Sequence, residues 1–188
     1  MTTPILLGII ASVVVIAIVL FRVIQATQAY YTYRGSWLVK CPETQQTAAV
    51  GVEARKAAAT ALWGNPTLRL DQCSRWPERQ NCGQECLQQI ETDPDHCLVW
   101  NIVSRWYEGQ TCALCHKRFG RLKHLDHPPA LMDADRKTTE WQEVRPEELA
   151  GILATYRPVC WDCHVTETFR RLNPELVVYR DRSARSQV

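Results

Sequence analysis

The chain has 188 residues, nine of them cysteine, and its 22 basic residues nearly balance its 20 acidic ones, for a formal net charge of +2. This balance requires neither nucleic acid nor a strongly acidic molecule as a partner. Nine cysteines exceed ordinary usage, so disulfides, bound metal or thiol chemistry must account for them. The choice among these three depends on the cellular compartment of the domain, and therefore on the membrane topology.

The N-terminal segment is an uncharged apolar run, PILLGIIASVVVIAIVLF, at positions 4–21. With Val23 and Ile24 it approaches the ~20 residues needed to cross ~30 Å of hydrocarbon. No Lys or Arg precedes the run, whereas a cleaved signal peptide has a basic start. We therefore predict one transmembrane anchor over residues 1–27.

The charges that flank this run predict its orientation. The first three are all basic, namely Arg22, Arg34 and Lys40. The positive-inside rule then places the N-terminus outside and the rest of the chain in the cytoplasm. The nearby aromatic residues are typical of a belt at the membrane surface: Tyr30, Tyr31, Tyr33 and Trp37. A reducing cytoplasm favours metal ligation by the cysteines over disulfides.

The region 28–107 shows alternating strand and helix signals. Strands are predicted at 37–40 and 47–52, on either side of a turn that contains Pro42. The Ala-rich segment 53–63 predicts a helix that stops at Gly64-Asn65-Pro66. Two more helices are predicted, one over 81–91 and one that begins at Pro94 and has Leu98, Ile102 and Trp106 on one face.

The region 108–175 begins at EGQT, which we interpret as the join between the two regions, and carries two CxxC pairs. We expect a β-hairpin between the pairs and a helix over 164–172. The tail 176–188 ends in DRSARSQV, which lacks apolar periodicity and is expected to fray. The fold class is therefore α+β, with one transmembrane helix followed by a small cysteine-rich domain.

The two pairs point to one metal site. They are Cys112-Ala-Leu-Cys115 and Cys160-Trp-Asp-Cys163. The two-residue spacing places both sulfurs of a turn on the same ion, and two such turns complete a tetrahedral Cys₄ site. The N-terminus of the helix after the second pair would stabilise thiolate charge. Zinc is the ion that we predict.

A thiol knuckle, a hairpin and a helix that opens with a second CxxC resemble a treble-clef zinc finger. Among treble clefs, the segment 112–164 is similar to the HNH endonuclease family, which has an Asp-His pair and a Pro after its first CxxC. Here LDHP stands at 125–128, and His164 follows the second pair. The resemblance implies that His127 activates water and that His164 helps to hold a catalytic metal. The central Asn and Gly-Gly of the family are missing from 128–156.

Both pairs also read as C-x-x-C-H, the sequence that attaches c-type haem. A membrane-anchored dihaem cytochrome in electron transfer is therefore an alternative. One haem would use Cys112, Cys115 and His116, and the other would use Cys160, Cys163 and His164. Distal ligands would come from His124 or His127. The predicted cytoplasmic location argues against haem attachment, which takes place across the membrane.

The upstream cysteines allow a second metal site. Cys82 and Cys86 have a spacing that can bring two thiols together, and Cys41 and Cys73 can complete a Cys₄ set. Cys97 would then remain a buried thiol beside His96. The same four thiols can hold an iron–sulfur cluster, because thiolate ligands alone do not choose between zinc and iron. Several of them can equally be small core residues.

These patterns together predict a single-pass protein with a structural zinc ion. A Cys₄ ion has no open coordination position for water or substrate, so we predict a non-enzymatic binding or assembly module at the cytoplasmic face. The expected partners are the membrane and another protein or a membrane complex, rather than nucleic acid. An HNH-like nuclease and a dihaem cytochrome are the alternatives.

Overall fold

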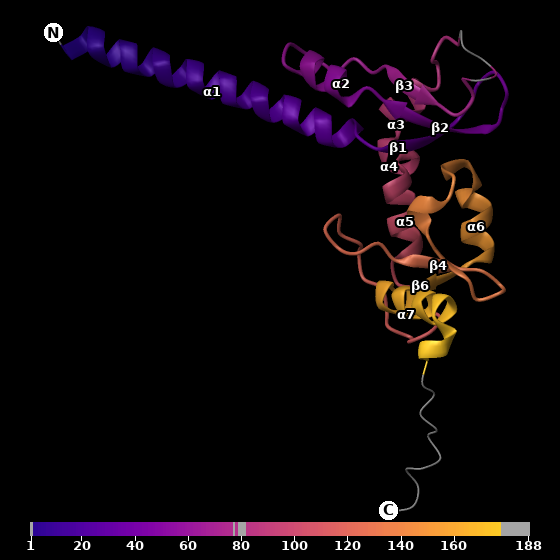
Figure 1. Cartoon of the computed structure of the whole chain (residues 1–188). Helices are drawn as coiled ribbons and strands as arrows, with labels where there is room; N and C mark the ends of the chain where they lie inside the picture. Colours follow the sequence, from indigo (N-terminus) through magenta and orange to yellow (C-terminus); the bar gives the residue numbers. More distant parts are fainter. Residues whose placement is uncertain (1, 77, 79–81, 178–188) are drawn as a thin grey trace, which may run out of the picture. The chain divides into compact units, whose positions relative to one another are not determined.

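The structure is a computed structural model and describes residues 2–76, 78 and 82–177. The chain divides into two compact units, Met1–Ile102 and Val103–Val188, and the division falls within helix α5 (Val99–Tyr107). Each unit contains both helices and strands (Figure 1), in agreement with the predicted α+β class. The predicted division into four segments stays a prediction.

Helix α1 runs from Thr2 to Tyr33 without interruption. Its apolar side chains are widely exposed, with Ile5 at 65% and Phe21 at 58%. Exposure of so much hydrocarbon to water is unfavourable, and a continuous apolar helix of this kind favours a non-aqueous environment. By length and composition Ile5–Tyr33 can span a membrane, and a signal sequence would meet the same test.

Helix α1 continues to Tyr33, beyond the end of the anchor predicted over residues 1–27. Its last turns pack against the rest of the first unit. Ala29 is buried, and Tyr33 packs against the core of this unit. The indole Nε1 of Trp37 donates a hydrogen bond to the Tyr33 carbonyl oxygen at 3.3 Å. Trp37 is only 1% exposed, so its predicted place in a membrane-surface belt is wrong: its large apolar ring is buried in the core.

The first unit is built on a three-stranded antiparallel sheet in the order β1-β2-β3. The strands are β1 (Ser36–Lys40), β2 (Thr47–Val52) and β3 (Leu70–Cys73). Alternate residues of β1 and β2 are buried, as expected when one face of a sheet covers a core. Both predicted strands are therefore confirmed, β2 with the same ends and β1 one residue longer.

The helices of the first unit differ more from the sequence pattern. Helix α2 (Ala54–Ala61) is shorter than predicted, and Trp63 beyond it is 88% exposed. The helix predicted over 81–91 is α3 (Leu87–Thr92); residue 81 lies outside the described residues, and Gln84 has a φ of 56° that ends any helix there.

The helix predicted from Pro94 onward is in fact two helices. α4 (Pro94–Cys97) ends at Leu98, whose extended backbone separates it from α5. Leu98 forms an isolated antiparallel bridge with Trp37, and its side chain packs against the core. This non-local contact overrides the local helical pattern, which would have placed Leu98 within a continuous helix.

The second unit has its own antiparallel sheet, in the order β5-β4-β6. The strands are β4 (Ala130–Met132), β5 (Thr138–Glu140) and β6 (Arg157–Val159). β4 and β5 form the predicted hairpin. Pro158 lies in the edge strand β6, where the missing N–H costs no ladder hydrogen bond.

Short helices surround this sheet. They are the 3₁₀ turns η1 (Trp141–Glu143), η2 (Pro146–Glu148) and η3 (Pro174–Leu176), and the α-helices α6 (Leu149–Thr155) and α7 (Trp161–Leu172). α7 contains the helix predicted over 164–172 and begins three residues earlier, directly after Cys160. Residues 178–188 of the predicted frayed tail lie outside the described residues.

Candidate metal centre

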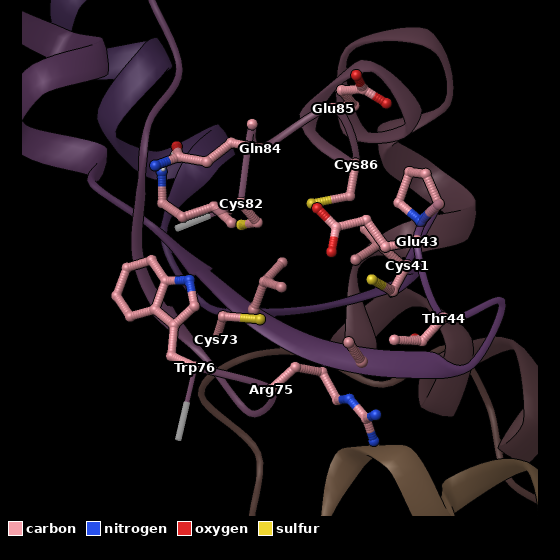
Figure 2. Close-up of a pocket in the computed structure, with 16 residues that line it drawn as sticks. Cys41, Glu43, Thr44, Cys73, Arg75, Trp76, Cys82, Gln84, Glu85 and Cys86 are labelled. Atoms are coloured by element: carbon pink, nitrogen blue, oxygen red, sulfur yellow. Dashed lines mark hydrogen bonds between the residues drawn. The ribbon is translucent and has the colours of Figure 1, made fainter. Parts of the chain in front are cut away.

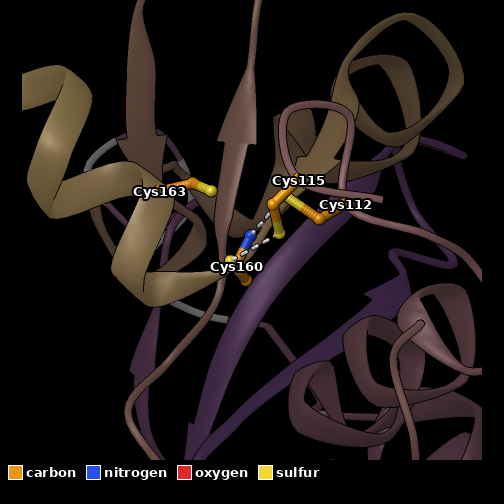
Figure 3. Close-up of side chains that lie close together, drawn as sticks. All are labelled: Cys112, Cys115, Cys160 and Cys163. Carbon is orange, nitrogen blue, oxygen red and sulfur yellow. Dashed lines mark hydrogen bonds between the residues drawn. The ribbon is translucent and has the colours of Figure 1, made fainter. Parts of the chain in front are cut away.

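Four cysteine sulfurs of the second unit come together at one point. The sulfurs of Cys112, Cys115, Cys160 and Cys163 all lie within 4.8 Å of one another. Figure 3 shows two of them on the loop that follows α5 and two at the start of α7. The two pairs that the sequence singled out therefore share one site, which could hold a metal ion.

The first pair stands on a tight knuckle. Thr111 and Arg118 form an isolated antiparallel bridge that closes its base. Within it, the Cys112 N–H donates to the Lys117 carbonyl at 2.8 Å, and the His116 N–H donates to the Cys112 carbonyl at 3.0 Å. His116 adopts a φ of 61°, which turns the chain back after Cys115. Backbone bonds thus fix both sulfurs on the same side of the turn.

The second pair is presented by β6 and α7. Cys160 precedes the first residue of α7 and Cys163 lies in its first turn. The Ala113 N–H donates to the Pro158 carbonyl at 2.8 Å, which fastens the knuckle to β6. The positive end of the α7 dipole points at the cluster and favours thiolate charge there.

Short contacts join the two pairs directly. The Cys160 N–H donates to the Cys112 sulfur at 3.3 Å, and the sulfurs of Cys115 and Cys160 lie 3.6 Å apart (Figure 3). Cys112 and Cys160 are buried, whereas Cys115 is exposed. Four thiolates around one point match the tetrahedral arrangement of a closed, structural metal site.

The pKa values of the four thiols differ because their surroundings differ. Burial opposes ionisation of Cys112, but backbone N–H groups of Cys115, Cys160 and Leu114 outweigh it and lower its pKa to about 7. Burial raises the pKa of Cys160 and of Cys163, and the neighbouring thiols raise that of Cys163 further. A bound cation would favour the thiolate form of all four.

The histidines named from sequence lie beside this cluster. His164 is within hydrogen-bond distance of Thr138, with 2.8 Å between Nδ1 and Oγ1, and its Nε2 lies 4.0 Å from Glu140 Oε1. The exposed ring of His127 stacks on Trp161 with centroids 5.0 Å apart and planes inclined by 10°. Trp161 also contacts His164, with centroids 5.7 Å apart.

Two of these neighbours were missed by sequence reasoning. Thr138 and Glu140 reach His164 because the β4–β5 register, with Ala130 opposite Glu140, brings that strand alongside α7. Their spacing from His164 carries no signal for this contact. His116 and His124, the other histidines of the haem hypothesis, both have exposed side chains.

The upstream cysteines gather in the first unit. Cys41, Cys73, Cys82 and Cys86 line one cavity of about 110 Å³ (Figure 2). Hydrogen bonds from Thr44 lower the pKa of Cys41, whereas burial raises that of Cys86 to about 11. Cys97 does not line this cavity, and its sulfur lies 3.8 Å from the Gln89 carbonyl.

Comparisons of the chain with protein-family models, with curated proteins and with solved structures found no match.

Proposed function

We propose that this chain is a single-pass membrane protein whose second unit is held together by a structural zinc ion, and that it acts as a binding or assembly module at the cytoplasmic face. The observation that carries the proposal is the convergence of four sulfurs, from Cys112, Cys115, Cys160 and Cys163, within 4.8 Å of one another. The candidate membrane helix at the N-terminus supports the anchor.

Zinc suits this site on chemical grounds. Thiolates prefer soft or borderline ions, and four of them in a tetrahedral set are typical of structural zinc. In the second unit Cys112 and Cys160 pack together with Met132 and Val159 in one buried cluster. A domain of this size commonly depends on a metal for its stability, because it buries little apolar surface. The ion would therefore contribute to folding rather than to a reaction.

The order of elements supports a treble-clef arrangement as part of this proposal. A knuckle with the first two ligands precedes the hairpin of β4 and β5, and α7 begins directly after Cys160. In such an arrangement the ion joins the knuckle to the first turn of the helix. The ion then braces two segments that otherwise meet through few backbone bonds.

A membrane location agrees with the way α1 joins the first unit. Its apolar residues are exposed, while Ala29 near its end is buried and Tyr33 packs against the core. A continuous helix between anchor and domain would hold the first unit close to the bilayer. Arg22, Arg34 and Lys40 support a cytoplasmic position for that unit.

A surface on α7 supports the binding role. On α7, Val165, Phe169 and Leu172 follow one another at intervals of four and three residues and are 45–65% exposed. This spacing places apolar side chains along one face of a helix. Exposed apolar stripes of this kind are typical of surfaces that bind another protein.

The geometry favours one shared ion over two haems. In a dihaem protein each CxxC pair bonds to the edge of its own porphyrin, so the two pairs are kept apart by the bulk of the macrocycles. Here the Cys115 and Cys160 sulfurs lie 3.6 Å apart, and the Cys160 N–H donates to the Cys112 sulfur. Separation of the pairs would break both contacts.

A nuclease is the second candidate, and one observation favours it. His127 and His164, the two histidines that the HNH resemblance implies, both contact Trp161. The test is cleavage of plasmid DNA with Mg²⁺ or Mn²⁺ by the wild-type protein, by His127→Ala and by the control His124→Ala. Cleavage lost only in His127→Ala would establish the nuclease, and the absence of cleavage by wild type agrees with the binding module.

The leading proposal is tested on full-length protein purified in detergent without chelator. Elemental analysis and an absorption spectrum should show zinc and no Soret band, and Cys115→Ser should lose one zinc per chain relative to wild type. Cys115 is exposed, so this change removes a ligand with little effect on packing. Cys97→Ser is the matched control and should keep all of its zinc. Haem absorbance, or wild-type protein without metal, would contradict the proposal.

A further inference from the structure

The four cysteines around the first-unit cavity are brought there by strand geometry. β1 and β3 both run antiparallel to β2, so they are parallel to each other and end at the same edge of the sheet. Cys41 directly follows β1, two residues after the buried Val39 and four after the buried Trp37, so the alternation of the strand places it on the same face. Cys73 ends β3 opposite the buried Val50. Both thiols therefore lie on the core face at one end of the sheet.

The other two thiols come from the loop before α3 and from the start of that helix. Gln84, between Cys82 and Cys86, accepts a hydrogen bond from the Leu70 N–H through its side-chain oxygen at 3.0 Å. This bond fastens the loop to the first residue of β3. Figure 2 shows Cys82 and Cys86 facing Cys41 and Cys73 across the cavity.

Helix α3 is fastened to the end of β1 next to Cys41. The side-chain oxygen of Gln89 accepts from the Lys40 N–H at 2.9 Å, and its amide nitrogen donates to the Lys40 carbonyl at 2.7 Å. Ser74 similarly exchanges two hydrogen bonds with the backbone of Ala49, directly after Cys73. The segments that carry the cysteines are therefore fixed by side-chain bonds independently of any ion.

Cys41 stands on a knuckle like that of Cys112. Backbone N–H groups two and three residues further on, at Glu43 and Thr44, interact with the Cys41 sulfur. In the second unit Leu114 and Cys115 stand in the same two positions relative to Cys112. Backbone N–H groups aimed at a sulfur stabilise it as a thiolate ligand. The two turns therefore present their first cysteine in the same way.

Two buried donors line the same cavity. Trp76 Nε1 and Arg75 Nε have no hydrogen-bond partner among the described residues, although another nitrogen of Arg75 pairs with Glu78 at 2.9 Å. Buried donors are normally satisfied, so an acceptor is expected there. Four thiolates around a divalent cation carry a net charge of −2 and would supply an acceptor for Trp76 Nε1, whereas Figure 2 shows the Arg75 guanidinium directed away from the four sulfurs.

We propose that Cys41, Cys73, Cys82 and Cys86 form a second tetrahedral zinc site, which lies entirely within the first unit and is independent of the site in the second. Its sulfurs are spread more widely than those of the second-unit cluster, which alone among the described residues brings its ligand atoms within 4.8 Å of one another. Binding of the ion would draw the four sulfurs inward and displace their thiol protons, with no change of oxidation state.

The role of such an ion follows from the elements that it joins. It would link the end of β1 to the end of β3 and to the loop before α3, which both lie far from β1 in sequence. The first unit also contains the last turns of α1. The second ion would therefore stabilise the unit that continues directly from the candidate membrane helix.

Native mass spectrometry of the full-length protein, released from detergent micelles after purification without chelator, tests this inference. We expect two zinc ions per chain in wild type and in the control Cys97→Ser. Cys86→Ser and Cys115→Ser should each retain one, and the double variant none. One zinc in wild type, kept by Cys86→Ser and lost by Cys115→Ser, would overturn the second site and leave the proposed function intact.

Three further measurements keep the inference testable if Cys86→Ser does not fold. Wild-type protein loaded with ¹¹³Cd should give two NMR resonances, both from four-thiolate sites, and a single resonance would overturn the proposal. Trp76→Phe should lower the zinc affinity of the second site about 10- to 100-fold, since removal of an outer hydrogen-bond donor has effects of that order. Acid-labile sulfide with iron, or a Cys82–Cys86 disulfide in the purified chain, would also refute zinc at this site.

Discussion

The hydrogen bond of Tyr107 gives the sharpest stability prediction for the second unit. Tyr107 is fully buried, and its hydroxyl donates to the Ala130 carbonyl at 2.8 Å. Ala130 begins β4, which pairs with β6, the strand that leads into Cys160. The change Tyr107→Phe keeps the ring, which packs against Trp106 and Phe119, and removes only the hydroxyl.

Removal of this hydroxyl takes away the donor that the buried Ala130 carbonyl uses. We expect Tyr107→Phe to lower the free energy of unfolding by about 1–3 kcal/mol, the range for a buried group that loses its partner. The assay is hydrogen exchange of peptides from β4 and α7 in zinc-loaded full-length protein. Tyr156→Phe is the control, since Tyr156 is half-buried and has no side-chain hydrogen bond among those found in the described residues.

The burial of Tyr107 also predicts that the stability of the folded protein depends on pH in the alkaline range. Burial raises the pKa of Tyr107 above its ordinary value of 10. The folded state therefore keeps a proton that the unfolded state loses above pH 10, so this contribution to stability is complete below pH 10 and declines as the pH rises further. The slope is at most about 1.4 kcal/mol per pH unit for one group. Tyr107→Phe should reduce this slope.

Equal stability of Tyr107→Phe and wild type, together with an unaltered alkaline slope, would refute this reasoning. Such a result would mean that the Ala130 carbonyl is satisfied without the tyrosine, and that Tyr107 is not buried in the folded protein.

Three further predictions concern the first core, the α7 surface and the anchor. Ile90→Ala should destabilise the first unit by about 2–5 kcal/mol in urea denaturation, because Ile90 is fully buried, and a change below 1 kcal/mol would contradict its place in the core. Leu172→Ser should alter stability by no more than about 0.5 kcal/mol, as expected of an exposed position, whereas Leu131→Ala in the core should cost about 2–5 kcal/mol. The intact mass of the protein extracted from membranes should include residues 1–27, and a cleaved N-terminus would identify a signal sequence instead.

Strands β1 and β2 were predictable because their signal is local. Short apolar runs at 37–39 and 48–50 stand on either side of a polar turn that contains Pro42. The end of α2 was harder to predict from the sequence. The Gly64-Asn65-Pro66 signal predicted that the helix would run to Trp63, but the helix ends at Ala61.

Non-local contacts explain what the sequence could not reveal about the fold. The break at Leu98 depends on its bridge to Trp37, which is distant in sequence and leaves no local pattern. The burial of Trp37 likewise depends on packing against the first-unit core, so an aromatic residue close to an apolar run was assigned to the membrane surface. Local propensity is overridden by tertiary packing in both cases.

The four cysteines of the metal centre were predictable from the sequence, whereas the contacts around them were not. The x₂ spacing indicates that Cys112 and Cys115 share a turn, because this spacing has a direct geometric meaning. That this turn meets Cys160 and Cys163 followed from the pattern of paired thiols, and the structure brings these four together. The contacts of His164 with Thr138 and Glu140 depend on strand register and had no sequence signal.

X-ray absorption at the zinc edge of the purified full-length protein tests the central claim most directly. We expect a first coordination shell of four sulfur atoms at about 2.3 Å from zinc, with no nitrogen or oxygen ligand. A first shell that contains nitrogen or oxygen, or a preparation that holds iron in place of zinc, would contradict it.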